Sequence, residues 1–214
     1  NTAVRVPRDP HRPLAWRREL TRGQHHEVVG ITNAARSART MLLQHRPKVV
    51  IAELRLLDGT AMAMIQWLAS EPAAVRPTIV IVSSDANDPL IAQALMAGAD
   101  NLYLVGNGSL LDCVNRTLRG ESSLTPPLAQ TLLDHFDRSL RSMSTWAALD
   151  ATESPLQLEP HERELLLRVA SGNSLAQLAD QRNLHPHVLG MQARHILRKV
   201  QWDQRAGALT LQVA

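Results

Sequence analysis

The sequence predicts an α/β domain built on a parallel sheet, followed by a smaller all-α domain. Short β-rich runs alternate with helical patterns over the first part of the chain, as in parallel sheets with crossover helices. The runs at residues 49–52 and 79–82 are wholly apolar, which is typical of strands buried on both faces. Three helical patterns with short spacers then fill residues 158–200. Together these observations place two domains on one chain.

The α/β part is expected to contain five strands. Four of them are predicted at residues 27–32, 48–54, 78–83 and 101–104, with helices near residues 34–45, 61–70, 90–97 and 110–119. The remaining strand lies near the start of the chain and is weakened by Pro7 and Pro10. Functional residues in such a sheet are expected at the carboxyl ends of the strands, which hold Glu53, Ser83 and Val105.

Turn and capping signals set the bounds of the three C-terminal helices. The first helix is expected to begin at Pro160, since proline suits the first helical position, and to end before Gly172. Ser174 and Gln177 have the spacing of a capping box at the start of the second helix. Pro186 begins the third helix after a short turn. Helices of this length and spacing indicate a helix-turn-helix.

A helical wheel divides the third helix into an apolar face and a basic face. The apolar face consists of Leu189, Ala193, Ile196 and Val200. The opposite face carries His187, Met191, Arg194 and Arg198, with His195 beside them and Lys199 on the flank. Exposed basic residues on a helix that fits the major groove of DNA contact guanine edges and phosphates. The alternative is a solvated helix face without a partner.

The C-terminal residues resemble the DNA-binding domain of the LuxR/NarL/FixJ regulators. The matching positions are Pro160, Glu162, Arg163, Glu164, Gly172, Ser174, Ala179, Ile196, Leu197, Arg198 and Lys199. Glu159 stands where the family has a capping threonine, and His185 where it has a serine, so a weaker cap is expected for the third helix. Gly190 replaces a basic residue that contacts DNA in the family. The resemblance implies sequence-specific binding to double-stranded DNA.

The N-terminal part resembles the receiver domain of response regulators, which has a flavodoxin-like fold with a five-stranded parallel sheet. The motifs that carry this resemblance are Glu53-Leu54-Arg55-Leu56-Leu57-Asp58-Gly59, Ser83-Ser84 and Gly98-Ala99-Asp100. In a working receiver an aspartate accepts a phosphoryl group beside an acidic pair that holds Mg²⁺, a hydroxyl and a lysine.

Of these four features, the acceptor, the acidic pair and the lysine are altered in the present sequence. Glu53 stands in the place of the acceptor, and Val105 in the place of the lysine. Pro10 and His11 stand where the acidic pair belongs, with Asp9 one step away, and this is a poor ligand set for Mg²⁺. We therefore predict a degenerate receiver that works independently of phosphorylation. Glu53 either imitates an activated state as a fixed charge or is a solvated strand-end residue.

The chain is expected to divide into a receiver-like domain at residues 1–122, an extra helix and linker at 123–155, and a helix-turn-helix domain at 156–214. The added helix is predicted at residues 124–141. Residues 203–214 are expected to form a separate helix that pairs two DNA-binding domains. A homodimer is predicted because a single helix-turn-helix buries little surface on DNA.

Composition narrows the classes of function. A formal charge of +3 gives a mild preference for polyanions, and the single cysteine, Cys113, suits a cytoplasmic protein without a disulfide framework. No apolar run approaches the roughly 18 residues of a membrane span. The histidines lack companions at metal-ligand spacing, and no nucleophile–base pair or cofactor motif is evident, so neither a metal, a cofactor nor an enzyme is expected.

The sequence thus predicts a cytoplasmic DNA-binding transcriptional regulator, with two alternatives. One is a protein-interaction module that modulates another regulator and no longer binds DNA well. The other is a sensor whose small ligand lies over the carboxyl ends of the sheet, where Val105 leaves room. DNA binding distinguishes the first alternative, and ligand-induced thermal stabilisation the second.

Overall fold

The computed structural model describes residues 2–6, 16, 18–21, 26–72, 74–144 and 157–212. Its contacts divide the chain into two compact units, Asn1–Gly120 and Glu121–Ala214. The sequence assigned residues 123–155 to a separate helix and linker, whereas this division places their helix in the C-terminal unit. Among the described residues, no helix combines the length and apolar composition needed to span a membrane.

The N-terminal unit is built on the parallel sheet that the sequence predicts. Its 5 strands lie in the order β2-β1-β3-β6-β7. They are β1 (Thr2–Val6), β2 (Glu27–Ile31), β3 (Val49–Glu53), β6 (Thr78–Ser83) and β7 (Asn101–Leu104). A short antiparallel pair, β4 (Arg55–Leu56) and β5 (Gly59–Thr60), follows β3. The strand order reverses between β1 and β3, so the carboxyl end of β3 lies where such sheets place their sites.

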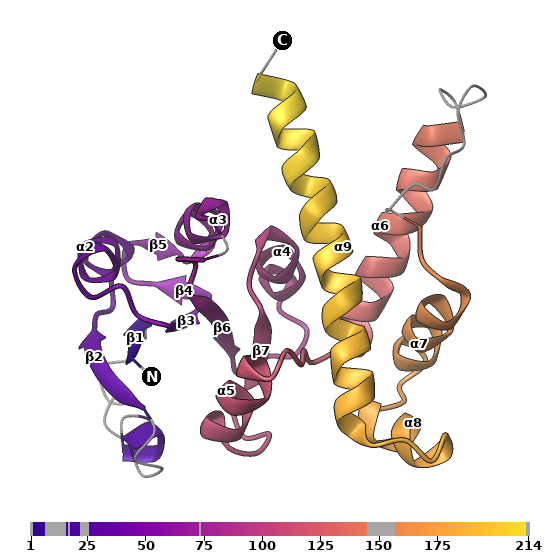
Figure 1. Cartoon of the computed structure of the whole chain (residues 1–214), viewed down its shortest axis with the longest axis horizontal. Coiled ribbons are helices and arrows are strands. Elements are labelled where there is room, and N and C mark those ends of the chain that lie inside the picture. Colours follow the sequence, from indigo (N-terminus) through magenta and orange to yellow (C-terminus); the bar gives the residue numbers. More distant parts are fainter. Residues whose placement is uncertain are drawn as a thin grey trace. The chain divides into compact units, whose positions relative to one another are not determined.

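Helices cover both faces of this sheet, which explains why its central strands are wholly apolar. They are α2 (Ala35–His45), α3 (Met62–Ser70), α4 (Pro89–Ala97) and α5 (Leu110–Leu118), close to the predicted bounds. Figure 1 shows α2, α3 and α4 on one side of the sheet and α5 on the other. Trp16 and Leu20, which precede β2, join α5 in the core that covers Ile51 and Val80. The α/β prediction is confirmed.

Two of the receiver-like motifs have clear structural roles. Both carboxylate oxygens of Asp58 accept hydrogen bonds from the first amides of α2, those of Ala35 at 2.8 Å and Arg36 at 3.3 Å. These amides lower the pKa of the Asp58 carboxyl below its usual value. A methyl group on Gly98 would overlap Cβ of Ala69, and the φ of +133° at Gly98 also favours glycine. Asp58 therefore fixes the start of α2, and Gly98 allows the end of α4 to lie against α3.

The C-terminal unit consists of four described helices. They are α6 (Pro126–Ser144), α7 (Pro160–Ala170), α8 (Leu175–Gln181) and α9 (Pro186–Gln212). The predicted apolar stripe of the third helix is confirmed, because Leu189, Ala193, Ile196 and Val200 are all fully buried. The α/β plus helix-turn-helix fold class is therefore correct.

Helix α6 is part of the core of this unit. Its residues Leu128, Leu132 and Phe136 are buried. Two contacts join it to the other helices: a hydrogen bond between His135 and Asp203 of α9 at 3.1 Å, and an ion pair between Asp137 and Arg163 of α7 at 2.8 Å.

Helix α9 runs without interruption to Gln212, which corrects the expected separate helix at residues 203–214 (Figure 1). Between Val200 and Gln212 the sequence holds no proline and one glycine, Gly207. A lone glycine costs a helix about 1 kcal/mol but does not end it. Residues 213–214, and residues 145–156 of the predicted linker with Trp146, lie outside the described part of the chain.

Candidate functional sites

Side-chain caps hold the starts of α8 and α9. Ser174 and Gln177 form the predicted capping box, since Ser174 Oγ accepts from Gln177 N at 3.2 Å and Gln177 Oε1 accepts from Ser174 N at 2.8 Å. The weak cap expected at His185 is wrong. Its ring nitrogen Nδ1 accepts from His187 N at 3.2 Å and so replaces the hydroxyl of a serine. The starts of both helices are therefore fixed.

One side of α9 presents a continuous row of exposed side chains. Its members are spaced by three or four residues and are Val188, Met191, His195, Arg198 and Trp202, here named the exposed stripe. Met191 is 49% and Trp202 58% exposed. Three of the predicted DNA-binding residues, Met191, His195 and Arg198, lie on this stripe.

Arg194 does not lie on the exposed stripe, although the wheel placed it on the outward face. Its exposed fraction is only 9%, so Arg194 is a buried residue in this structure. The prediction of an exposed Arg194 is therefore wrong. A wheel separates a helix's apolar core face from the rest, but it does not show what else packs against the remaining sides.

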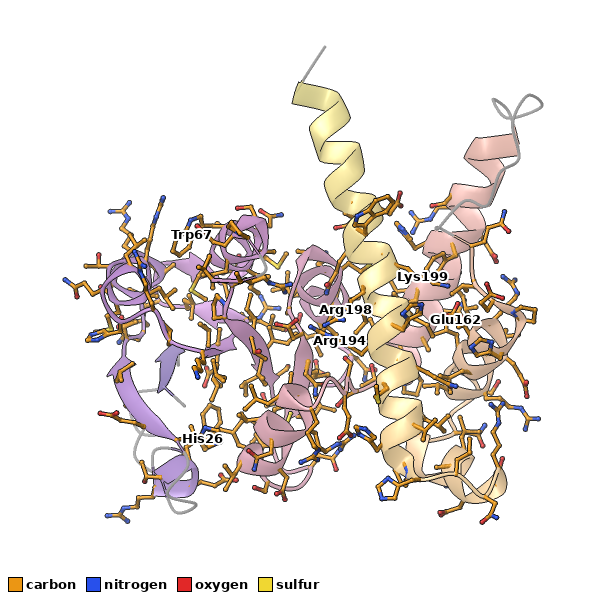
Figure 2. The ribbon with its side chains drawn as sticks, viewed as in Figure 1. His26, Trp67, Glu162, Arg194, Arg198 and Lys199 are labelled. Carbon is orange, nitrogen blue, oxygen red and sulfur yellow. The ribbon has the colours of Figure 1, made fainter. Side chains whose placement is uncertain are left out.

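Lys199, the second misplaced cation, belongs to a buried ion pair that joins α9 to α7. Its Nζ lies 2.6 Å from Oε2 of Glu162 and donates to Gln157 O at 3.1 Å. The side chains of Lys199 and Glu162 are 15% and 2% exposed. The same Oε2 accepts from Glu159 N at 2.8 Å at the start of α7. Figure 2 labels both side chains, and the ion pair means that Lys199 is not a free cation on the flank of α9.

His187, the remaining predicted DNA-binding residue, pairs with a carboxylate that the sequence did not single out. Its Nδ1 lies 2.9 Å from Oε1 of Glu121, whose side chain is 3% exposed. The next residue, Ser122, donates its backbone N–H to Gly190 O at 2.9 Å. Gly190 was expected only to remove a DNA contact, but its carbonyl oxygen also accepts this hydrogen bond. A glycine inside a helix was the one local sign of such a close approach.

The structure brings the degenerate receiver residues to neighbouring strand ends. Glu53 ends β3 and is half-buried, and its Oε1 atom is buried, so this carboxylate is not a freely solvated strand-end group. Ser83 Oγ donates to Asp85 O at 2.9 Å and accepts from Asp85 N at 3.1 Å, which engages the hydroxyl in a local turn. Val105 is exposed, and its N–H donates to Ser83 O at 2.9 Å.

Asp9, the fourth residue of the predicted pocket, lies outside the described residues, as do Pro10 and His11. A cation that the sequence did not single out follows Glu53 instead. Arg55 lies 3.2 Å from a carboxylate oxygen of Asp88, which also caps α4 by accepting from Leu90 N at 3.0 Å. Arg55 thus forms an ion pair with the residue that caps α4, Asp88, and this carboxylate is not that of Glu53.

Two other kinds of site were considered, a reactive thiol at Cys113 and a cluster of metal ligands among the described residues. The half-buried thiol of Cys113 packs on the core, and burial raises its pKa to about 11, so it is protonated and unreactive at neutral pH. Within the described ranges, no three His, Cys, Asp or Glu side chains come together as metal ligands.

The chain is similar to known response regulators over most of its length. It is 26% identical over 189 residues to the nitrate/nitrite response regulator protein homolog of Haemophilus influenzae, which covers 86% of this chain and 83% of that protein. No protein-family model matches the chain.

Solved structures share the fold at low identity. RcsB from Salmonella enterica serovar Typhimurium, bound to promoter rprA with a phosphomimetic, matches with a TM-score of 0.51 at 16% identity, over 94% of this chain and 92% of that one. RcsB has also been solved as two dimers on two parallel DNAs. The receiver domain of the putative regulator NarL from Mycobacterium tuberculosis matches 56% of this chain and 96% of its own, with a TM-score of 0.51 at 18% identity. The chain is thus homologous to a nitrate/nitrite response regulator and has the fold of the response regulator RcsB.

Proposed function

We propose that the chain is a DNA-binding transcriptional regulator that acts as a homodimer and does not depend on phosphotransfer. The exposed stripe of α9 supports this function most strongly. It displays Met191, His195 and Arg198 on a well-capped helix that follows a short helix and a tight turn. This is the arrangement by which a recognition helix enters the major groove.

The stripe combines two kinds of DNA contact. Val188 and Met191 lie in the first half of α9 and offer apolar contact to thymine methyl groups in the major groove. Arg198 lies about two to three turns further along, where a guanidinium reaches the phosphate backbone. His187 joins these residues at the start of the helix. RcsB, which has the same fold, is seen bound to DNA as dimers, which supports two copies of this chain on two half-sites.

An electrophoretic mobility shift of the full chain on pooled genomic fragments tests this function. We expect a reproducible subset of fragments to be retained at low salt, because base contacts add to the phosphate contacts. Retention of no fragment, or equal retention of every fragment, contradicts sequence-specific binding.

Glu53 and Val105 support the proposal that the receiver-like unit does not take part in phosphotransfer. The longer side chain of Glu53 displaces its carboxylate by one methylene from the place of an aspartate. Val105 supplies no cation to balance a phosphate. We predict no phosphoryl adduct after incubation with acetyl phosphate and Mg²⁺, measured by intact mass spectrometry under neutral, cold conditions. A stable adduct at Glu53 or a neighbouring residue contradicts this prediction.

The charge of Glu53 is expected to favour the active form. Glu53→Gln keeps the size of the side chain and removes its charge, so we expect weaker dimerisation or DNA binding with an unchanged thermal unfolding midpoint. Sedimentation and mobility-shift titrations measure the two effects. If dimerisation and DNA affinity both equal those of the wild type, Glu53 does not imitate activation.

One observation favours a second candidate function, a protein-interaction module. The exposed stripe contains three apolar residues, Val188, Met191 and Trp202, and exposed apolar patches on helices mark protein interfaces. The mobility-shift experiment separates the two functions, because a module that binds only protein retains no DNA.

A further inference from the structure

Helix α2 and the turn after it carry a concentrated group of positive charges. Residues 28–52 contain no acidic residue but hold four basic ones, Arg36, Arg39, Arg46 and Lys48, and all four are exposed. Their charges exceed the formal net charge of the whole chain, which is +3. Positive charge is therefore concentrated at one place on the N-terminal unit, and such a concentration attracts polyanions.

The three arginines lie in a row on one side of α2. Arg36, Arg39, Leu43 and Arg46 follow one another at spacings of three or four residues and are all exposed, so they share one side of the helix, here named the basic face. At 1.5 Å per residue, the basic face extends over about 15 Å. The phosphates of one DNA strand follow one another every 3.4 Å or so along the axis, about four of them over this length. The basic face can therefore contact several phosphates of one backbone.

Arg39 and Arg46 are not neutralised by acids of the protein. Within the ranges that the structure describes, neither guanidinium forms an ion pair. The guanidinium of Arg39 lies over the ring of Trp67 on α3, 5.1 Å from the ring centroid, and Figure 2 labels this tryptophan. Stacking on an aromatic ring holds a guanidinium in place and leaves its N–H groups able to donate to a phosphate. Arg39 is therefore positioned but not occupied.

Arg36 differs from these two residues because an acid lies near it. The pKa of Asp58 is lowered chiefly by the Ala35 amide and also by the charge of Arg36, so the Arg36 charge is partly offset. Arg39 and Arg46 are thus the main cations of the basic face.

Arg46 occupies a backbone conformation that favours glycine. It has φ 42° and ψ 58°, in the left-handed region, and its N–H donates to Leu42 O at 3.0 Å where α2 ends. Glycine is the usual residue at this position of a helix end, since a β-carbon is strained there. A strained residue that persists points to a function of its side chain, and this side chain is a cation.

The basic face suits a phosphate backbone better than an acidic protein. Protein interfaces have an apolar core, whereas the basic face holds a single apolar residue, Leu43, which is 59% exposed. One exposed leucine is ordinary on a protein surface. Arginine, in contrast, binds phosphate with two parallel N–H bonds.

We propose that the basic face of α2 is a second DNA-binding surface, which contacts the phosphate backbone of a duplex. This inference rests on the proposed DNA-binding function and adds a contact from the other unit of the chain. Phosphate contacts carry no sequence information, so α2 raises the affinity for every duplex and leaves the choice among sequences to α9.

The first test measures how the affinity of the full chain for a labelled scrambled duplex depends on salt. For Arg39→Gln combined with Arg46→Gln, we expect the slope of log K against log salt to fall by about two units, one for each phosphate contact. Arg39→Gln alone is expected to lower it by about one unit. Arg18→Gln is the matched control, because Arg18 is exposed between Trp16 and Leu20, which pack with α5 on the other side of the sheet. An unchanged slope for the double variant, or equal slopes for Arg18→Gln and Arg39→Gln, overturns the proposal.

Arg46→Gly separates binding from folding. Glycine suits the left-handed conformation at the end of α2, so we expect a thermal unfolding midpoint equal to or above that of the wild type. The salt slope is nevertheless expected to fall by about one unit. A cation with a purely structural role would give the opposite result, a lower midpoint with unchanged DNA binding, and this result overturns the proposal.

The second test uses a chemical label on the unmodified chain, which has two lysines, Lys48 and Lys199. Lys48 is exposed two residues after Arg46, whereas the side chain of Lys199 is 15% exposed. We expect saturating duplex to slow the acetylation of Lys48 by an N-hydroxysuccinimide ester several-fold, measured by peptide mass spectrometry, because phosphates shield the lysine that they contact. This protection is expected to shrink when Arg39 and Arg46 are both replaced by glutamine. Equal acetylation with and without duplex overturns the proposal.

The outcomes separate this inference from the function on which it rests. If the wild type binds duplex while the double variant keeps its salt slope and Lys48 is not protected, the role of α2 is overturned and DNA reading by α9 stands. The basic face is then left to an acidic protein partner. If the wild type binds no duplex at low salt, the DNA-binding function fails and the inference fails with it.

Discussion

Replacing Lys199 by methionine is expected to destabilise the C-terminal unit by about 3 kcal/mol. The substitution keeps most of the side-chain volume but removes the ammonium 2.6 Å from Glu162 Oε2. Glu162 is 2% exposed, so its carboxylate then stays buried without its closest cation. Breaking one side of a buried pair costs about 3–5 kcal/mol, and the partial exposure of Lys199 places the effect at the lower end.

Native-state hydrogen exchange of the α7 and α9 amides in the full chain measures this loss, since it reports the opening free energy of each unit separately. Glu162→Gln is the matched control. It removes the buried charge while keeping an oxygen that accepts from Glu159 N, so we expect a loss of only about 1 kcal/mol. Combining it with Lys199→Met is expected to recover part of the stability. A loss below about 1 kcal/mol for Lys199→Met means that the pair behaves as a surface ion pair.

Arg198→Ala is expected to lower the affinity for DNA by about tenfold or more at low salt. Arg198 is exposed on the stripe, and a phosphate contact supplies affinity on every sequence. The slope of log K against log salt is therefore expected to fall by about one unit, measured by fluorescence anisotropy. Folding is expected to be unaffected, because the side chain lies away from the buried stripe of α9.

Arg168→Ala provides the control for net charge. Arg168 lies on α7 with 54% of its side chain exposed, and its closest described acid is Glu164 at 3.7 Å. We expect its removal to leave the salt slope unchanged. If both substitutions lower the salt slope equally, DNA affinity depends only on the total charge of the unit, and Arg198 makes no specific contact with DNA.

Periodicity and capping signals predicted most of the fold. The apolar runs became β3 and β6, and the helices begin at the predicted Pro160 and Pro186. These features depend on residues close together in the sequence, which is why they were readable without a structure. The length of α9 was not predicted. A new helix was expected to begin after Val200, although no helix-breaking residue stands there.

The candidate site was predicted less well because it depends on contacts between distant residues. Met191, His195 and Arg198 are exposed as expected. Lys199 was misassigned because its partner Glu162 lies 37 residues earlier, on a different helix. Glu162 gave a partial signal, since an acid at the third position of a helix that starts with proline suggests a capping box.

Glu121 gave no signal of its own. It lies near the end of the α/β part, and nothing in its neighbourhood distinguishes it from a solvated acid. Only the distances to His187 and Gly190 reveal its position on α9. A glycine inside a basic helix is the kind of local exception that indicates an unseen neighbour.

Titration of DNA binding against salt, with the full wild-type chain, tests the central claim most directly. A genomic fragment retained in the mobility-shift experiment is compared with a scrambled duplex of the same composition. We predict that log K falls linearly with log salt for both duplexes and that the genomic fragment stays tighter throughout, by at least about 1 kcal/mol. No binding to either duplex at low salt, or identical affinities for both, would contradict DNA reading by α9 and leave the protein-interaction function in its place.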